Sequence, residues 1–339
     1  MDFSLSETQE QLVGAVGRWV ERRWADGESD LSAAAVRRAR WSELSANGWT
    51  GLLSPPAMPV LDAALMVERF AYGGCTLPVG PGALVAPFVA AAAGLGVSPG
   101  IDQLCVLDGA HHPDAPSASA ARGLELADRV VVLASAPGPG GRRWSAGAVP
   151  VGPDAITVVQ DEGRTVLSRL AAFPARSELA PLDRVMGELA WLLGAVLSAA
   201  ELVGLARAVL DSCVAYAKVR IQGGKPIGGH QAVQHRLVDM LGHVERARYL
   251  TYLAATALSG TSEALPADGV VREVHQAKAL AARDCVAAIR SGHQVMGAIS
   301  FSAEHDLHHF HKQAVVAAHE FGGASWHWAA LEGAARALT

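Results

Sequence analysis

The chain has 339 residues, half of them apolar and 18% charged, which provides for a large core and excludes an intrinsically disordered protein. Its formal net charge of −5, from 28 basic and 33 acidic residues, argues against a nucleic-acid or anionic-membrane partner. The four cysteines are scattered and form no C-x-x-C pair, which indicates a reducing compartment. This pattern predicts neither a disulfide framework nor a zinc knuckle.

Residues 1–100 have the apolar spacing of helices. The first predicted helix carries apolar side chains at helical spacing, namely Leu12, Val13, Val16, Trp19 and Val20. Further helices are expected from a cap at Asp30 to Asn47, over 61–72 and over 84–95. An uncharged stretch over 79–98 contains two prolines, so it is predicted as a buried helix and not as a membrane span. We interpret this zone as an N-terminal helical domain.

Residues 101–178 contain short apolar runs separated by Gly, Pro, Ser and Asp, which predicts short strands joined by turns. The runs are Leu104–Val106, Val130–Leu133, Ile156–Val159 and Val166–Leu167. The zone is predicted to be a reduced β-domain, too small for a full sandwich or barrel. Its Gly138–Arg143 segment lacks a G-x-G-x-x-G or Walker pattern and is interpreted as a solvent turn.

Residues 179–339 are strongly helical. Long periodic segments are expected over 183–219, 230–259, 268–296 and 313–338, which predicts a C-terminal four-helix bundle. The fold class is therefore mostly α with a small central β-domain. An acidic residue follows Met1 and no basic segment accompanies it, so we expect no signal peptide and a soluble, cytoplasmic protein.

Two local patterns are candidates for a ligand site. His305, His308, His309 and His311 cluster beside Glu304, but as helical pairs they occupy two different faces, so a hydrogen-bonding or subunit-contact cluster is favoured over a metal site. Arg220 closes a predicted helix and is followed by a Gly-rich turn and a new helix. That arrangement suits either a pyrophosphate or a helix-hairpin turn with a C-terminal cation.

The same residues carry a family resemblance. Arg220, the Gly-Lys-Pro-Ile of its turn and the Gln-Ala-Val-Gln-His that begins at Gln231 resemble the signature turn of the acyl-CoA dehydrogenases. The segments 294–301 and 304–308 also resemble that family. The resemblance implies an N-terminal helical domain, a small β-domain, a four-helix bundle, FAD as the cofactor and an acyl-CoA as the substrate.

The resemblance also implies roles for single residues. Arg220, Gln231, Gln294 and Gly297 correspond to residues that hold the adenosine pyrophosphate of the FAD bound by the neighbouring subunit. The chain departs from the family at Ala298, which stands where the family has a second glycine, and at Gly223, which stands where the family has a phenylalanine. The loops that normally wrap the flavin ring are not found between 100 and 180.

The catalytic base is the larger departure. The two positions at which branches of the family place the proton-abstracting glutamate align with Gly194 and Gly323, and glycine cannot abstract a proton. Glu201 lies roughly 10 Å along the helix from Gly194, which is too far to replace it. Glu320 is the remaining weak candidate for a base.

Together these features resemble the non-catalytic subunit of actinobacterial α2β2 heterotetramers that dehydrogenate steroid side-chain acyl-CoAs. The resemblance implies a partner chain of the same family that carries the catalytic Glu, and an FAD shared between the two chains. Two alternatives stay open: a self-sufficient acyl-CoA dehydrogenase that uses Glu320 as a displaced base, and a non-catalytic scaffold or regulator.

Overall fold

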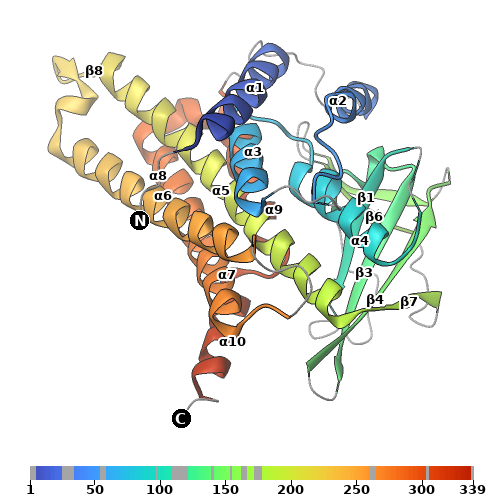
Figure 1. Ribbon diagram of the computed structural model, residues 1–339. Helices are drawn as coiled ribbons and strands as arrows, with labels where there is room; N and C mark the ends of the chain where they lie inside the picture. Colours follow the sequence, from blue (N-terminus) through green and yellow to red (C-terminus); the bar gives the residue numbers. More distant parts are fainter. Residues whose placement is uncertain are drawn as a thin grey trace.

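A computed structural model describes the chain except for residues 1–4, 25–33, 54–58, 97, 99, 109–120, 139–140, 153–154, 162–165, 172–177, 260–264, 303–304 and 337–339. Helices form one side of the molecule and two β-sheets the other (Figure 1). The predicted class, mostly helical with a small sheet region, is confirmed. The domain boundaries at 100 and 178 stay predictions.

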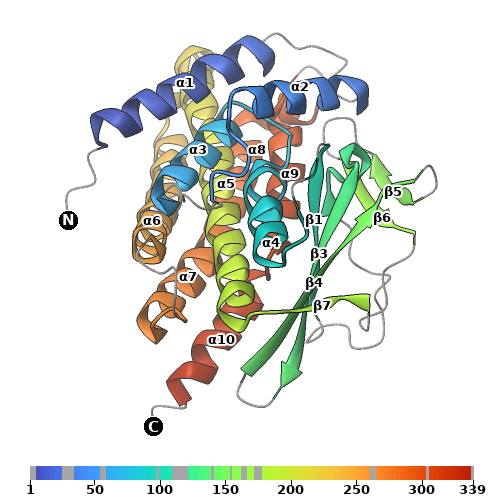
Figure 2. The same cartoon turned by 45° about the vertical axis from the view of Figure 1, so that its right-hand side comes forward.

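The N-terminal helices are α1 (Glu7–Trp24), α2 (Ala34–Ala46), α3 (Val60–Tyr72) and α4 (Ala86–Ala92), with α4 preceded by a wider helical turn, η1 (Val79–Val85). Helices α1 and α2 lie across one end of the molecule (Figure 2). They are joined to α3 by an aromatic cluster in which Trp19, Trp49 and Phe70 meet edge-to-face at 5.5–5.7 Å, a geometry that aromatic pairs prefer.

The strands form a four-stranded and a three-stranded sheet. The first has the order β1 (Asp102–Asp108), β3 (Arg129–Gly138), β4 (Gly141–Pro150), β7 (Ala180–Leu182), and the second β2 (Ala121–Arg122), β6 (Val166–Leu170), β5 (Ile156–Asp161). Along β3, Val130 and Val132 face a core shared with Leu170 of the second sheet, whereas Val131 and Leu133 join the core of the helices. This alternation is the period of two of a strand that is buried on both faces.

The bundle is built around α5 (Arg184–Val219), a helix of 36 residues that begins at an Asp183 cap. Within the described chain, α5 is the one helix long and apolar enough to cross a membrane, yet its apolar window is entirely buried in the protein core. Gly204 allows α3 to lie against α5, because a Cβ at this position would overlap the carbonyl oxygen of Glu68.

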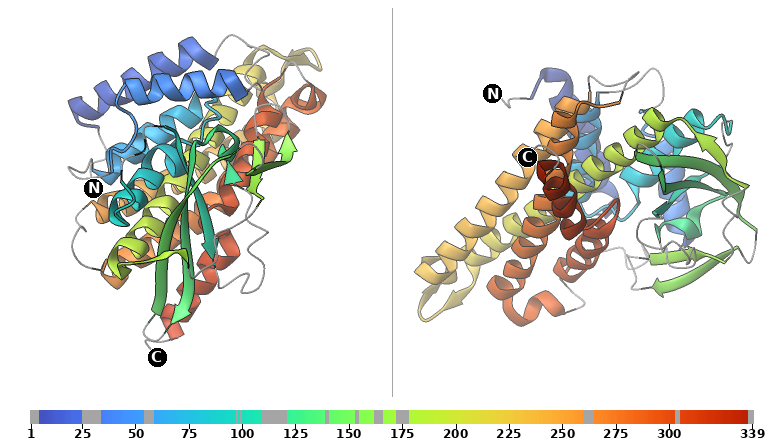
Figure 3. Two further views of the ribbon diagram at one scale, coloured as in Figure 1. Left: turned by 90° about the vertical axis from the view of Figure 1, so that its right-hand side faces the viewer. Right: turned by 90° about the horizontal axis from the view of Figure 1, so that it is seen from below.

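The other bundle helices are α6 (Gln231–Leu258), α7 (Asp268–Leu280), α8 (Val286–Met296), α9 (Leu307–His319) and α10 (Ala324–Arg336). Helix α7 continues into α8 through a wider helical turn, η6 (Ala281–Cys285). Together they span the single helix predicted over 268–296. The hairpin of β8 (Ile221–Gln222) and β9 (Lys225–Pro226) lies at the end of the bundle farthest from the sheets (Figure 3).

Two expectations for these segments are wrong. The helix predicted over 313–338 is two helices, α9 and α10, because the chain turns at Phe321 and Gly322, which have φ angles of 55° and 97°. Strand β3 is longer than the predicted run over 130–133, and β4 was not predicted; the two strands have ten residues each and pair along their whole length. The small residues in these strands predict turns from the sequence alone. They remain in extended strands because β3 and β4 are each hydrogen-bonded to a strand on either side.

Candidate functional site

The turn at Arg220 is a preorganised hairpin. Arg220 ends α5, and its carbonyl oxygen accepts a hydrogen bond from the backbone N–H of Ile227 at 2.8 Å. Gly223 and Gly224 form the tip with φ angles of 61° and 78°, which favour glycine. Lys225 Nζ donates to the carbonyl oxygen of Gly229 at 2.8 Å, so it fastens the turn to the start of α6.

The Arg220 side chain is available to a ligand. It is exposed, and among the described residues it has no hydrogen-bond or ion-pair partner. Gln231 lies at the first position of α6 and is also exposed. The structure therefore presents a cation and an amide on either side of one rigid hairpin, at the tip of the bundle.

Gln294 and Gly297 lie at the same end of the bundle as the hairpin. Helix α8 ends just after Gln294, and Arg236 of α6 contacts Ser291 of α8 at 3.3 Å. Gly297 has a φ of 68°, and a Cβ built on it would meet no atom within 4 Å, so its backbone is open to close approach. The four residues predicted to contact FAD are thus exposed at one end of the bundle.

The predicted base position on α5, Gly194, is filled by a neighbouring side chain. A Cβ on Gly194 would overlap the ring of Phe321, which is 6% exposed. Trp191, one turn earlier on α5, contacts the same ring edge-to-face at 5.9 Å. Gly323, the other predicted base position, follows Phe321 by two residues, and a Cβ at Gly323 would come no closer than 3.6 Å to His319.

Phe321 is held there by histidines. Its φ of 55° is the one left-handed angle of a non-glycine residue in the described chain, and such strain persists only where the surroundings enforce it. The ring atom Nε2 of His327 contacts the carbonyl oxygen of Phe321 at 3.1 Å, and Nδ1 of His327 contacts Nδ1 of His275 at 2.7 Å. Burial lowers the pKa of His327 to about 2 and that of His275 to about 4, so both rings are neutral at pH 7.

The β3–β4 hairpin closes this region from the sheet side. The Arg142 guanidinium lies 4.9 Å from the ring centroids of Trp191 and Trp326 and 5.6 Å from that of Trp144, distances at which cation–π attraction operates. Arg142 belongs to the segment interpreted as a solvent turn. Its side chain instead packs on the bundle, while Pro139 and Gly140 of that segment lie outside the described residues.

A buried ionic network joins the β-domain to the bundle. Arg122 of β2 donates to both carboxylate oxygens of Glu201 at 2.5 and 2.8 Å, and to both oxygens of Glu320 at 2.9 and 2.7 Å. Gln313 adds a donor to Glu201 at 2.8 Å. The side chains of Arg122 and Glu201 are 3% and 5% exposed. A carboxylate held in this way acts as an ion-pair partner.

The pKa values of the buried groups are consistent with an ionised pair of Arg122 and Glu201. Burial acts to raise the pKa of Glu201, but the charge and hydrogen bonds of Arg122 and the amide of Gln313 hold it below its usual value. Lys278 is fully buried and donates to the carbonyl oxygen of Ala317 at 2.6 Å. Burial lowers the pKa of Lys278 to about 7, although Glu320 and Glu201 act in the opposite direction.

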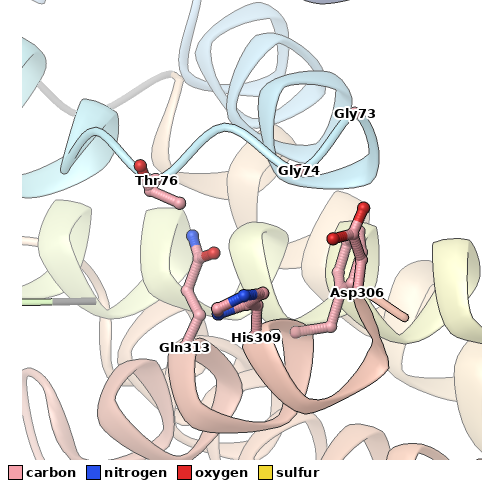
Figure 4. A pocket seen from close by; sticks show the side chains of 7 residues that line it. Gly73, Gly74, Thr76, Asp306, His309 and Gln313 are labelled. Atoms are coloured by element: carbon pink, nitrogen blue, oxygen red, sulfur yellow. The ribbon is translucent and has the colours of Figure 1, made fainter. Parts of the chain in front are cut away.

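The histidine cluster is distributed over separate contacts. His293 of α8 contacts His311, whereas His308 contacts the carbonyl oxygen of His305. His309 lines a small cavity of about 40 Å³ with Thr76, Asp306 and Gln313 (Figure 4). Among the described residues no group of three or more His, Cys, Asp or Glu side chains could hold a metal ion; Glu304 lies outside them.

Comparison with known proteins shows what this chain is similar to. Residues 184–327 match the model of the acyl-CoA dehydrogenase C-terminal domain. The chain has the acyl-CoA dehydrogenase fold. It is 39% identical over 142 residues to acyl-CoA dehydrogenase FadE34 of Mycobacterium tuberculosis, and 36% identical over 120 residues to acyl-CoA dehydrogenase IpdE2 of Mycolicibacterium smegmatis. These matches cover 41% and 35% of this chain but only 18% and 35% of the relatives, so the chain matches a fifth to a third of their length.

Solved structures match over nearly the whole chain. The ChsE4–ChsE5 complex of Mycobacterium tuberculosis matches with a TM-score of 0.74 at 19% identity, covering 100% of both chains. The Tcur3481–Tcur3483 steroid ACAD G363A variant matches with 0.72 at 21%, covering 98% and 100%. The FAD complex of PigA matches with 0.73 at 18%, covering 96% and 97%. At these identities the matches establish the fold.

The sequence did not reveal three features of the site: the Phe321 ring against Gly194, the Arg122 network and the Arg142 contact with the tryptophans. Each joins segments far apart in the chain, such as Arg122 and Glu320, which are 198 positions apart. The one local signal was the pair of glycines after Phe321, which marks a break in the predicted last helix.

Proposed function

We propose that this chain is the non-catalytic subunit of a heteromeric FAD-dependent acyl-CoA dehydrogenase. The partner chain supplies the catalytic glutamate, the flavin-ring pocket and the acyl-CoA site. This chain supplies Arg220, Gln231, Gln294 and Gly297 to the adenosine and pyrophosphate of the partner's FAD. The substrate is an acyl-CoA with a bulky group, of the steroid side-chain class.

The observation that carries this proposal is the filled base position. A glutamate at position 194 would have to occupy the space of the Phe321 ring, and Glu201 and Glu320 both accept hydrogen bonds from Arg122. A general base needs an accessible carboxylate within hydrogen-bond reach of the proton it removes. Neither carboxylate meets that requirement in the described structure.

The residues at the bundle tip fit the adenosine side of FAD. Its pyrophosphate is a dianion, which suits an exposed guanidinium without an internal partner, and the open backbone at Gly297 permits close approach of a phosphate. When bound, FAD supplies the hydride acceptor for α,β-dehydrogenation. The role of this chain is to bind the cofactor and to position it, and the proton is removed by a group of the partner.

The heteromer and the substrate class draw support from the fold neighbours. One neighbour is a complex of two differently named chains, ChsE4 and ChsE5, and another is a steroid acyl-CoA dehydrogenase with two named components. A chain whose own base position is filled needs such a partner in order to contribute to catalysis.

The test is purification of the tagged chain from its native host. We expect a second acyl-CoA dehydrogenase-like chain to co-purify in equal amount, with flavin absorbance and with dehydrogenation of a steroid side-chain acyl-CoA. The recombinant chain alone, at 35.2 kDa per subunit, should be colourless and inactive. Turnover by the chain alone, abolished by Glu320→Gln, would instead establish a self-sufficient enzyme.

The variant Arg220→Ala tests the cofactor role. Charge-assisted hydrogen bonds of about 1.5–3 kcal/mol correspond to a roughly ten- to hundredfold loss of FAD affinity, which excess FAD should partly reverse while the complex still assembles. Arg272→Ala is the matched control, since Arg272 is also exposed but lies on α7, away from the hairpin. Unchanged flavin content in Arg220→Ala would favour a scaffold role.

A further inference from the structure

A positively charged side chain lies among three indole rings where the four-stranded sheet meets the bundle. The Arg142 guanidinium is 4.9 Å from the ring centroids of Trp191 and Trp326 and 5.6 Å from that of Trp144. The three rings belong to three different elements, β4, α5 and α10, and the β3–β4 hairpin reaches the side of α10 at this point (Figure 2). We call Trp144, Trp191 and Trp326 the indole box.

The indole box is built of closely packed parts. Trp191 is its central ring, with centroid distances of 6.1 Å to Trp144 and 5.4 Å to Trp326. Trp144 lies directly on the backbone of α5, because a Cβ at Gly187 would overlap its ring, and it pairs with Leu182 of β7. Trp144 and Trp191 are both buried. A cation in the indole box therefore meets aromatic faces that are already in place and desolvated.

The charge of the indole box favours one class of ligand. The faces of indole rings attract cations, and a guanidinium is flat and more weakly hydrated than an ammonium group, so it costs less to bring against them. The ring of His275 lies 5.5 Å from that of Trp326. Burial and the charge of Arg142 lower the pKa of His275 to about 4, so this neighbour adds no positive charge at pH 7. The indole box therefore suits a flat organic cation with a single charge.

We propose that the indole box is a binding site for cations of the guanidinium class, that Arg142 occupies it as an internal ligand, and that this contact fastens the β3–β4 hairpin to the bundle. The fastening lies beside the filled base position, since Trp191 is one turn before Gly194 and contacts the Phe321 ring at 5.9 Å. The indole box contains neither Arg220 nor any other residue assigned to FAD, so its test is separate from that of the cofactor role.

Amide hydrogen exchange of the full chain measures the fastening. Loss of a cation–π contact corresponds to roughly two- to thirtyfold in a local opening equilibrium, so Arg142→Ala should raise the exchange rates of β4 amides by such a factor. Arg143→Ala is the matched control, because Arg143 is exposed and lies on the other face of β4. Arg142→Lys keeps the charge without the flat guanidinium and should give intermediate rates. Trp326→Leu removes one ring and should raise the rates although Arg142 is intact.

Two small probes test the site itself. The Arg142→Ala chain is titrated with methylguanidinium and with methylurea, which has nearly the same flat shape but no charge, at concentrations below the unfolding transition. Methylguanidinium should change the tryptophan fluorescence saturably and restore slow exchange in β4, whereas methylurea should do neither. Equal responses to the two probes would overturn the inference. Exchange in β4 that is no faster in Arg142→Ala and Trp326→Leu than in Arg143→Ala would overturn it as well, and Trp326→Leu decides this alone if Arg142→Ala fails to fold.

Discussion

Replacing Arg122 with alanine should lower the free energy of unfolding by much more than the loss of an exposed charge would. The substitution removes four charge-assisted hydrogen bonds and leaves the carboxylates of Glu201 and Glu320 beside one another, with side chains 5% and 17% exposed. Removing one partner of a buried ion pair typically lowers the free energy of unfolding by about 3–5 kcal/mol, which is a large part of the about 5–15 kcal/mol that stabilises a domain.

The assay is urea denaturation of Arg122→Ala beside Arg38→Ala. Arg38 pairs with Asp128 at 2.6 Å and donates to the carbonyl oxygen of Leu126 at 2.6 Å, but the side chains of the ion pair are 41% and 44% exposed. Its loss should therefore lower the free energy of unfolding by only about 1–2 kcal/mol. A double variant, Arg122→Met with Glu201→Gln, should recover part of the loss because it removes the buried unpaired charge. Equal denaturation midpoints for Arg122→Ala and Arg38→Ala would refute the buried network.

The pH dependence provides a second check. In the wild-type chain the pKa of Glu201 lies below its usual value of 4.5, so its contribution to stability is complete above pH 4.5 and is lost as pH falls through the folded-state pKa. In Arg122→Ala, burial without the guanidinium raises this pKa. Protonation then relieves the unpaired charge, and the difference between variant and wild type should shrink as pH falls from 7 towards 5. A difference that does not change with pH would contradict this reasoning.

Three further predictions follow from the filled base position and the buried thiols. Gly194→Glu should fold poorly because its side chain overlaps the Phe321 ring, whereas Gly323→Glu should fold because its Cβ comes no closer than 3.6 Å to His319. In a spectrophotometric assay without the partner chain, neither variant should dehydrogenate an acyl-CoA. Phe321→Ala should lower the free energy of unfolding by about 3–5 kcal/mol, measured by urea denaturation, and a loss below about 1 kcal/mol would mean that the ring is not packed. The four cysteines are buried, and burial raises the pKa of each thiol, so a chromogenic disulfide at pH 8 should react with none of them until the chain is unfolded.

The helices and the candidate cofactor residues could be predicted from the sequence because their signals are local. Apolar spacing along α5 and α6 depends only on neighbours a few positions away. The Arg220 turn and the segment that contains Gln294 and Gly297 are contiguous patterns, and the structure exposes all of these residues at one bundle end. The cofactor role itself stays a prediction, since it depends on a molecule and a partner that local patterns do not include.

The state of the site was decided by tertiary structure. The glycine at position 194 showed only that a base is missing, whereas packing shows that the Phe321 ring occupies the space and that its backbone is bent to a left-handed angle to do so. The sequence excludes Glu201 by its distance along the helix from Gly194 and keeps Glu320 as a weak candidate near Gly323, but the partner of both, Arg122, lies 79 and 198 residues away on a short strand. An ion pair depends on distance in space and on burial, and neither quantity is encoded in the spacing of residues along the chain.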